Sequence, residues 1–483
     1  MKYLPDKPPT PLLESSVRGK FRYDTGEYVP QGGFIADFVL YTRGIETPTK
    51  FAVWSALMGV SIILKRDAYM DWFPKPLYPN LFLMLVAPPR ICAKTTCVEI
   101  AADIIELLEK VFDNPKMKAG KSINAHRGKA TPEMLFDLMK AKKVEIIHPE
   151  EGPVEGPDPE DKTEEFIDKL NASQSKALPP EAVVEESFQG ISEISLIIDE
   201  LTTFLGKQKY NETLVDILTH FYDCPNRADE ATRSYGAQTL ENVYLTFFGA
   251  TTPDAFNSSL PETAFGGGFL SRTIISANYL PTRSFPMPSL LEGAPSEDEI
   301  AERLAWIAST ALGGYVFSKE AYDEYVKWYH VFKESLVGDP LADARARMDT
   351  NLIKLCVILR AQRYERGNVI ARQDFLDAKY LITEALESSR ELYSGANGSE
   401  YYTQLQMISR YVEKKTAEGK PPTRATLIRE FTVKKITPEL LTKLIGHLMQ
   451  SELVEVTLNG GPPLITQSEH PMEQIHFKEP TDE

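Results

Sequence analysis

Two apolar runs, each followed by polar residues, dominate the hydrophobic pattern of this chain. Residues 81–87 are all apolar, and apolar side chains then recur at helical spacing between residues 95 and 112. Residues 196–198 are also apolar, and Asp199 and Glu200 follow them directly. A strand buried on both faces of a parallel sheet reads as a continuous apolar run, whereas an amphipathic helix repeats every 3.6 residues. The pattern therefore predicts an α/β protein with a parallel-sheet core.

The remaining periodicity predicts helices beside this core and a small C-terminal unit. Residues 34–66 predict two helices, and a further helix starts where Thr131 acts as the cap and Pro132 takes the first helical position. Residues 231–249 predict a hairpin that turns near Tyr235-Gly236, followed by another core strand. Near the C-terminus, a winged helix is predicted from helices at 401–416, 423–431 and 437–450 and a β-wing at 452–466.

These elements predict a division of the chain into successive parts. The length of 483 residues exceeds what one simple core accommodates, so two or three domains are expected. The predicted parts are an N-terminal irregular and helical segment (1–75), a core (76–290) with an acidic insertion (149–188), a helical lid (291–398), the winged helix (399–470) and a tail (471–483).

Composition indicates an ordinary globular protein. Apolar residues make up 42% and charged residues 25% of the chain. No apolar run reaches the roughly 18 residues that a membrane helix needs, and the N-terminus has no apolar signal core. We therefore expect a cytoplasmic protein without a membrane segment. Its four cysteines are scattered without metal-binding spacing, which indicates reduced thiols.

The net charge of -16 argues mildly against a nucleic-acid protein, but the acidic residues are unevenly distributed. Between Glu150 and Glu186 there are 12 acidic and 3 basic residues, a net charge of -9, which leaves -7 for the rest of the chain. Five prolines interrupt the same segment, so it reads as a loosely structured insertion. Because the acidic residues are concentrated in this segment, a basic surface elsewhere on the protein is compatible with the net charge.

The turn after the first apolar run has the layout of a phosphate-binding loop. Such a loop joins a buried strand to a helix N-terminus, whose amides and dipole hold phosphate groups. Lys94 occupies the position that reaches the β- and γ-phosphates, and Thr95 the position whose hydroxyl binds Mg²⁺. Pro88 and Ala93 replace the two usual glycines, while the amides of Ala93, Lys94, Thr95 and Thr96 are retained. An alternative is a strand, loop and helix with an exposed lysine.

The second apolar run ends in carboxylates that complement this loop. Asp199 has the position of a carboxylate that supports Mg²⁺, and Glu200 that of a general base for the attacking water. The alternative is a buried strand that ends in solvated acids. The order of the two motifs along the chain favours a P-loop NTPase.

With both motifs placed, the chain resembles the AAA+ class of ring ATPases over roughly residues 34–395. It is most similar to phage- and plasmid-encoded helicase-like proteins found with primases, and more remotely to minichromosome maintenance helicases. The latter also have alanine before the Walker lysine, as in Ala93-Lys94-Thr95. The two lost glycines depart from the family pattern.

The resemblance implies roles for three further residues. Thr252, in Thr251-Thr252-Pro253 after an apolar strand, corresponds to a sensor of the γ-phosphate, although many relatives have asparagine there. Arg272, in Leu270-Ser271-Arg272, corresponds to an arginine finger that acts on the neighbouring subunit. Arg347, with Arg345 as the alternative, corresponds to a sensor arginine of the lid. A surface arginine after a flexible loop is the alternative for Arg272.

DNA contacts are expected at the predicted hairpin if the chain is a ring helicase. Arg233 would contact phosphates and Tyr235 would stack on a base. An ordinary hairpin with an exposed arginine fits the same residues. In the predicted winged helix, only Lys443 and His447 of residues 437–450 face outward, so DNA binding and protein docking are equally compatible with it.

The sequence thus predicts an ATP- and Mg²⁺-dependent DNA helicase or translocase of a phage or mobile element. It would form a homo-oligomeric ring, a hexamer by preference, act on single- or double-stranded DNA, work with a partner such as a primase, and reside in the bacterial host cytoplasm. The first alternative is a catalytically degenerate member of the fold that serves as a DNA-binding or protein-interaction module, such as a loader or initiator. The second is an ATP-driven protein remodeller.

Overall fold

The computed structural model describes most of the chain. The described residues are 28–30, 32–90, 92–112, 123–128, 130–139, 191–204, 209–232, 236–259, 268–337, 342–393, 398–433, 436–450, 454–457 and 464–467. The predicted acidic insertion (149–188) and the tail (471–483) therefore lie outside the described residues.

A five-stranded parallel sheet forms the centre of the molecule, as the apolar runs predict. Its strand order is β3-β4-β7-β2-β8. The strands are β3 (Ala125–Arg127), β4 (Glu193–Ile198), β7 (Tyr244–Thr251), β2 (Phe82–Val86) and β8 (Thr273–Ala277). The apolar runs at 81–87 and 196–198 thus correspond to β2 and β4. Strand β7 lies between them, so the carboxyl ends of all three meet at one edge.

Both faces of the sheet are covered, and alternate residues of β2 enter different cores. Leu83 and Leu85 pack with N-terminal and later helices. Phe82, Met84 and Val86 pack with the helices on the opposite face. This alternation explains the uninterrupted apolar run, because a strand buried on both faces has no position left for a polar side chain.

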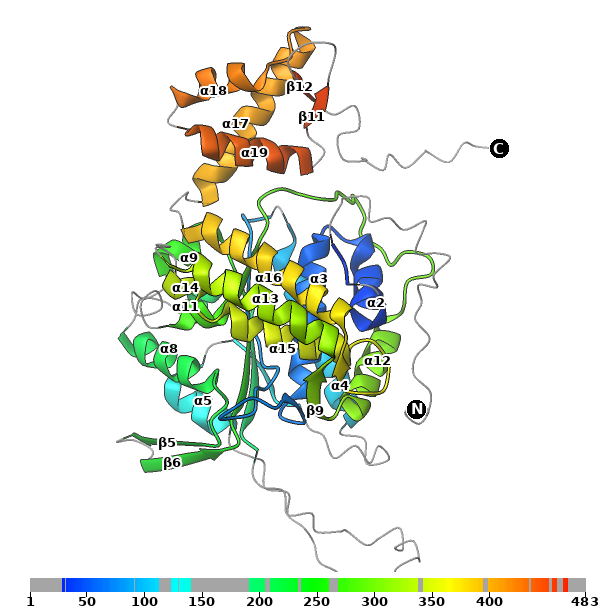
Figure 1. Cartoon of the computed structure of the whole chain (residues 1–483), viewed down its shortest axis with the longest axis vertical. Helices are drawn as coiled ribbons and strands as arrows, with labels where there is room; N and C mark the ends of the chain where they lie inside the picture. Colours follow the sequence, from blue (N-terminus) through cyan, green and yellow to red (C-terminus); the bar gives the residue numbers. More distant parts are fainter. Residues whose placement is uncertain are drawn as a thin grey trace, which may run out of the picture.

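The first face is covered by helices from two distant parts of the sequence, which share one hydrophobic core (Figure 1). The two helices predicted within 34–66 are present and pack beside α4 and α12. The helices of this core are α2 (Gly33–Tyr41), α3 (Thr49–Leu64), α4 (Lys94–Phe112), α12 (Glu297–Thr310), α13 (Lys319–Ser335), α15 (Met348–Ala361) and α16 (Arg372–Tyr393).

The second face is covered by shorter helices between the strands. Helix α5 begins at Pro132 as predicted, and the Met134 amide donates to Thr131 Oγ1 at 3.2 Å. The helices on this face are α5 (Pro132–Met139), α7 (Leu201–Phe204), α8 (Lys209–Phe221), α9 (Pro253–Ser259) and α11 (Phe269–Arg272). A four-residue helix, α14 (Ala342–Arg345), contacts α11.

A second, three-stranded parallel sheet was not predicted. It consists of β1 (Ala68–Met70), β9 (Gly313–Phe317) and β10 (Val369–Ile370), with β9 in the middle. The predicted helical lid (291–398) is mostly helical, and β9 and β10 are short strands within it. Strands of two to five residues are too short for a periodic pattern, and the pairing of β1 with β9 joins segments more than two hundred residues apart.

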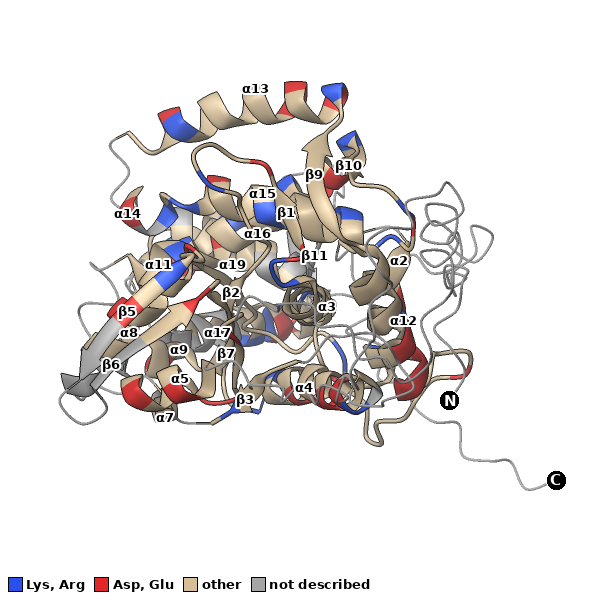
Figure 2. Cartoon of the chain, turned by 90° about the horizontal axis from the view of Figure 1, so that it is seen from below, with Lys and Arg blue, Asp and Glu red and all other residues tan. Residues whose placement is uncertain are grey.

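Two peripheral parts extend from this body. Strands β5 (Arg227–Thr232) and β6 (Gly236–Glu241) form an antiparallel ribbon that projects from it (Figures 1 and 2). The C-terminal part contains α17 (Gly398–Ala417), α18 (Arg424–Thr432), α19 (Pro438–Gln450) and an antiparallel pair, β11 (Val454–Thr457) with β12 (Leu464–Gln467). This element order agrees with the predicted three helices and β-wing.

In the part of the chain that the structure describes, no helix combines the length and apolar character needed to cross a membrane.

A buried ion pair ties α2 to α12 within the first core. Arg303 Nη1 lies 2.7 Å from Asp37 Oδ2, and the side chains of Arg303 and Asp37 are 10% and 1% exposed. The Tyr364 hydroxyl donates to the same Asp37 oxygen at 2.9 Å. The pair therefore depends on both partners, since a carboxylate left alone in this core is strongly destabilising.

We expect Arg303→Met to lower the free energy of unfolding by about 3–5 kcal/mol, because Asp37 loses its compensating charge. Adding Asp37→Asn should restore part of this loss. Arg372→Met, which breaks the exposed pair with Glu324, is the control and should leave the unfolding free energy almost unchanged. Urea unfolding measures all three, and equal effects of the two single substitutions would contradict the prediction.

Candidate nucleotide-binding site

The predicted phosphate-loop and carboxylate residues lie at the same edge of the central sheet. Lys94 begins α4, shortly after β2, and Asp199 follows the last residue of β4. Thr252 follows β7, the strand between them. Neighbouring strands are about 4.8 Å apart, so the ends of β2 and β4 are separated by about 10 Å. The three segments thus lie beside one another at the carboxyl end of the sheet.

The backbone at Ala93 has the conformation that a glycine normally supplies. Its φ is +40°, in the left-handed region, and Arg90 earlier in the loop has a φ of +59°. A left-handed conformation costs a non-glycine residue about 1–2 kcal/mol. Thr47 Oγ1 donates to the Ala93 carbonyl at 3.3 Å. The loop therefore keeps the expected turn without its glycine.

The far side of the loop is held by Cys92 and the end of β8. The Cys92 thiol donates to the Leu280 carbonyl at 3.3 Å, and the Asn278 side-chain amide donates to Cys92 Sγ at 3.2 Å. The Asn278 backbone amide also donates to the Val86 carbonyl at 2.9 Å. Sequence patterns did not single out Thr47, Cys92 or Asn278, since each is an isolated polar residue without a motif.

Lys94 is 8% exposed in spite of its charge. Burial lowers its pKa from the ordinary value, while the nearby charge of Glu200 and the Cys92 thiol act in the opposite direction. The interaction with Glu200 indicates that the loop lysine and the carboxylate motif share one electrostatic environment. Thr95, in the first turn of α4, is half-buried, and Thr96 is exposed.

The position between Lys94 and the acidic residues is occupied by the end of β7. Thr251 is fully buried, and Thr252 caps α9 by accepting a hydrogen bond from the Ala255 amide at 3.2 Å. A hydroxyl that accepts still has a proton to donate. Asp199 is exposed and Glu200 is half-buried, so both carboxylates border the open side of this edge.

Arg272 lies at the opposite edge of the sheet. It directly precedes β8, whose first residue, Thr273, is in register with Phe82 at the start of β2. Lys94 follows the end of β2, and this strand has five residues, so the two edges are about 16 Å apart. The guanidinium of Arg272 donates to the Gly268 carbonyl at 3.0 Å and to Asp223 Oδ2 at 3.3 Å.

Arg347, predicted as a lid arginine beside the nucleotide, lies with Arg272 and not with Lys94. Its Nη1 is 3.7 Å from Asp223 Oδ1, and its side chain is 42% exposed. Arg345, the alternative, lies in α14, and burial followed by the charge of Arg390 lowers its pKa. The single lid helix predicted around Arg347, from Ala342 to Leu355, is divided into α14 and α15, with Arg347 as the N-cap of the second. The sequence also could not indicate which end of the strands Arg347 approaches.

Arg233 and Tyr235, the predicted DNA contacts, lie outside the described residues. The strands on either side of them, β5 and β6, form the projecting ribbon, as the predicted hairpin requires. Within the described part of this ribbon, Arg227 pairs with Asp229 at 2.9 Å.

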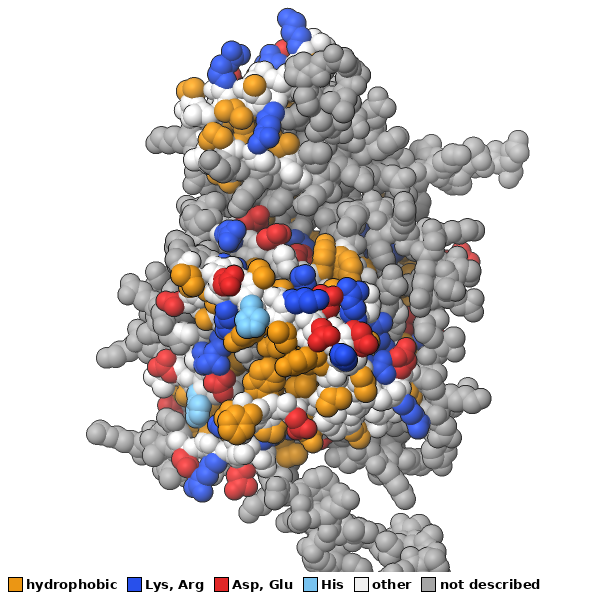
Figure 3. Space-filling view, viewed as in Figure 1, with side chains coloured by type: hydrophobic (Ala, Val, Ile, Leu, Met, Phe, Trp, Pro, Cys, Tyr) orange, Lys and Arg blue, Asp and Glu red, His pale blue; other side chains and the backbone are white. Residues whose placement is uncertain are grey.

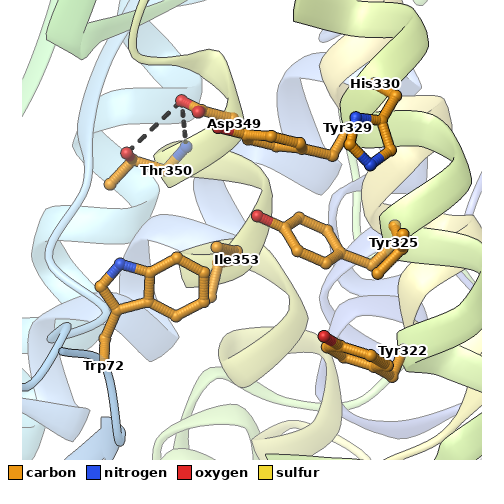
Figure 4. A pocket seen from close by; sticks show the side chains of 9 residues that line it. Trp72, Tyr322, Tyr325, Tyr329, His330, Asp349, Thr350 and Ile353 are labelled. Atoms are coloured by element: carbon orange, nitrogen blue, oxygen red, sulfur yellow. Dashed lines mark hydrogen bonds between the residues drawn. The ribbon is translucent and has the colours of Figure 1, made fainter.

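A separate open cavity of about 500 Å³ lies between α13 and α15 (Figure 4). Tyr322, Tyr325, Tyr329 and His330 come from α13, and Asp349, Thr350 and Ile353 from α15, with Val326 and Trp72 completing the lining. Apolar side chains gather on this face of the molecule (Figure 3). The residues predicted to bind nucleotide do not line this cavity.

No family model matches this chain, and no curated protein matches it either. The geometry itself therefore has to indicate which ligand fits the site. An N-terminal helix turn, a buried lysine and a hydroxyl at Thr95 suit an anionic phosphate chain. Asp199 and Thr95 supply the oxygen ligands that Mg²⁺ prefers. The residues at this end of the sheet thus fit a phosphate chain with Mg²⁺.

We expect Ala93→Gly to raise the free energy of unfolding by about 0.5–1 kcal/mol, because relief of the left-handed strain exceeds the added entropy of the unfolded chain. Ala101→Gly, within the regular part of α4, is the matched control and should lower it by about 1 kcal/mol. Thermal or urea unfolding measures both. Equal destabilisation by the two substitutions would show that Ala93 is not strained.

Proposed function

We propose that this chain is an ATP- and Mg²⁺-dependent ATPase of the ring-forming AAA+ type that moves along DNA. The observation that carries the proposal is the meeting of Lys94, at the N-terminus of α4, with Glu200 and Thr252 at one sheet edge. Bound ATP with Mg²⁺ would supply the phosphoryl group that is transferred to water. The buried lysine, the hydroxyls and the carboxylates then have complementary roles.

In this proposal each residue acts on a different part of the phosphate chain. The amides from Ala93 to Thr96 and the Lys94 ammonium hold the phosphates, and burial strengthens the lysine's attraction for an anion. Asp199 and Thr95 orient the metal. Glu200 accepts a proton from the attacking water, and the Thr252 hydroxyl fixes the water or γ-phosphate.

The separation of the two sheet edges supports a ring. Arg272 is about 16 Å from the edge that carries Lys94, so it cannot complete the site of its own chain. A neighbouring subunit that presents Arg272 would bring a guanidinium to the developing charge on the γ-phosphate. Arg347, which lies beside the same Asp223, would reach the neighbouring subunit together with Arg272. A head-to-tail contact of this kind forms a ring when the rotation between subunits closes, and six subunits are expected on the resemblance.

DNA as the substrate is supported by the family resemblance and by the projecting β5–β6 ribbon. The ribbon lies away from the sheet edge that carries Lys94, as a substrate-contacting element would. Its predicted tip residues, Arg233 and Tyr235, combine a phosphate contact with a stacking surface. A primase is the expected partner on the resemblance alone.

We expect Lys94→Ala and Glu200→Gln each to abolish DNA-stimulated ATP hydrolysis. Glu200→Gln should still bind an ATP analogue, because it removes the base and leaves the phosphate contacts in place. Steady-state turnover and calorimetric titration with Mg²⁺ and the analogue measure the two properties. Unchanged turnover in both variants would rule out the proposed function. Absence of analogue binding by the wild-type protein would favour the non-catalytic module.

A mixing experiment tests whether Arg272 acts between subunits. Lys94→Ala and Arg272→Ala proteins should each be inactive, whereas their equimolar mixture should regain about a quarter of wild-type turnover. This fraction follows because about half of the sites keep Lys94 and about half of their neighbours supply Arg272. The mixture should be compared with each variant alone at the same total concentration. An inactive mixture that still assembles would contradict a role for Arg272 in trans.

A further inference from the structure

One stripe of polar side chains on helix α15 is buried. Asn351 and Lys354 are three residues apart on this helix, and Arg347 is its N-cap. Positions separated by three, four and seven residues share a face of a helix. This stripe faces the sheet edge that carries Arg272. Asn351 and Lys354 are both buried, with exposed fractions of 0% and 1%.

Lys354 is bound at the start of the phosphate-loop strand. Its ammonium donates to the Asn80 carbonyl at 3.0 Å and to Asn80 Oδ1 at 2.7 Å. The same nitrogen lies 3.5 Å from the centre of the Tyr222 ring. Burial lowers the pKa of Lys354 to about 7, while the Cys224 thiol and the charge of Asp223 act in the opposite direction. The Asn80 oxygens and the Tyr222 ring stabilise the charged form of the lysine. A charge in this position is costly, and the fold alone would be served by an apolar side chain of similar volume.

Asn351 and Tyr222 continue these contacts to Arg272. The Tyr222 hydroxyl donates to Asn351 Oδ1 at 2.7 Å, and Asn351 Nδ2 donates to the Arg272 carbonyl at 3.2 Å. The Arg272 guanidinium lies 5.6 Å from the centre of the same Tyr222 ring that Lys354 contacts. Asn80 completes the connection, because its side-chain amide donates to the Tyr222 carbonyl at 3.0 Å.

Gly268 allows the arginine to fold back into this arrangement. Its φ is +84°, and a Cβ at this position would lie 2.7 Å from Arg272 Nη1. The backbone and the side chain of Arg272 are therefore both fixed, the first by Asn351 and the second by Gly268, Tyr222 and Asp223.

We propose that Lys354 and Asn351 are positioning residues for Arg272, which they hold at a set place relative to the start of β2. The proposal rests on the function proposed above and deepens it. Lys354 does not touch nucleotide, since it lies at the sheet edge opposite Lys94. Its effect on hydrolysis passes through Arg272 and is exerted on the site of the neighbouring subunit.

The test asks whether a substitution impairs the nucleotide site of its own subunit or that of the neighbouring subunit. We expect Lys354→Met, which keeps the volume and removes the charge, to lower kcat by about 10- to 100-fold through misplacement of Arg272. The affinity for an ATP analogue should stay within about twofold of wild type, because the Lys94 edge is unchanged. Asn351→Leu should have the same pair of effects.

Mixtures of variant proteins then distinguish an effect of Lys354 on Arg272 from an effect of Lys354 on β2 and the phosphate loop of its own chain. Lys354→Met mixed with Lys94→Ala should regain about a quarter of wild-type turnover, because the Lys94→Ala subunit supplies an intact Arg272. Lys354→Met mixed with Arg272→Ala should regain nothing, since both lack a working donor. The reverse pattern would overturn the proposal and place the effect of Lys354 on the phosphate loop of its own chain.

Two control substitutions distinguish a specific effect on Arg272 from a general loss of stability or of a nearby charge. Leu355→Ala, a buried apolar change on the same helix, lowers stability and should show neither mixing pattern. Lys333→Met, which removes a half-exposed lysine that pairs with Asp349 on α15, should leave turnover unchanged. If Lys94→Ala and Arg272→Ala fail to complement one another, the proposed function fails first. If they complement but Lys354→Met follows the Lys94→Ala pattern or equals wild type, the positioning role alone is overturned.

Discussion

The left-handed turn at Ala93 is the constraint on which the candidate site depends. It redirects the chain from β2 into α4, so that Lys94 enters the helix with its side chain buried. A chain that relaxed this turn would lose the first-turn amides as an anion site. The strain is small beside the burial of β2 on both faces and the contacts of Thr47 and Cys92, so the surrounding structure can maintain it.

The charged residues of the candidate site and those around Arg272 lie at opposite ends of the parallel strands. Lys94, Asp199 and Glu200 lie at the carboxyl ends of the strands, and Arg272, Arg347 and Lys354 lie toward the amino ends. Opposite ends of a strand cannot serve one small ligand. Under the proposed function, a complete site therefore needs two copies of the chain, and the buried contacts around Tyr222 support the subunit interface from within one copy.

Much of this architecture could be predicted, and the failures share a physical cause. Strands β2 and β4 were evident because burial on both faces leaves an uninterrupted apolar run, and the start of α5 was evident because Thr131 and Pro132 act locally. Strands β1, β9 and β10 were missed, since they are short and their pairing is long-range. The edge approached by Arg347 was also out of reach, because helical periodicity defines a face of a helix and not its neighbour. Lys354 did offer a signal: a lone charge within Leu352-Ile353-Lys354-Leu355.

The first turn of α15 contributes to two different surfaces. Asp349 and Thr350 line the aromatic cavity beside α13, while Arg347 and Asn351, from the same turn, face Asp223 and Arg272. A packed helix moves as a rigid unit, so a compound bound among those tyrosines would displace Arg347 and Asn351 together with the cavity wall. Under the proposed function, such a compound would inhibit hydrolysis without competing for the nucleotide site, so raising the nucleotide concentration would not reverse it.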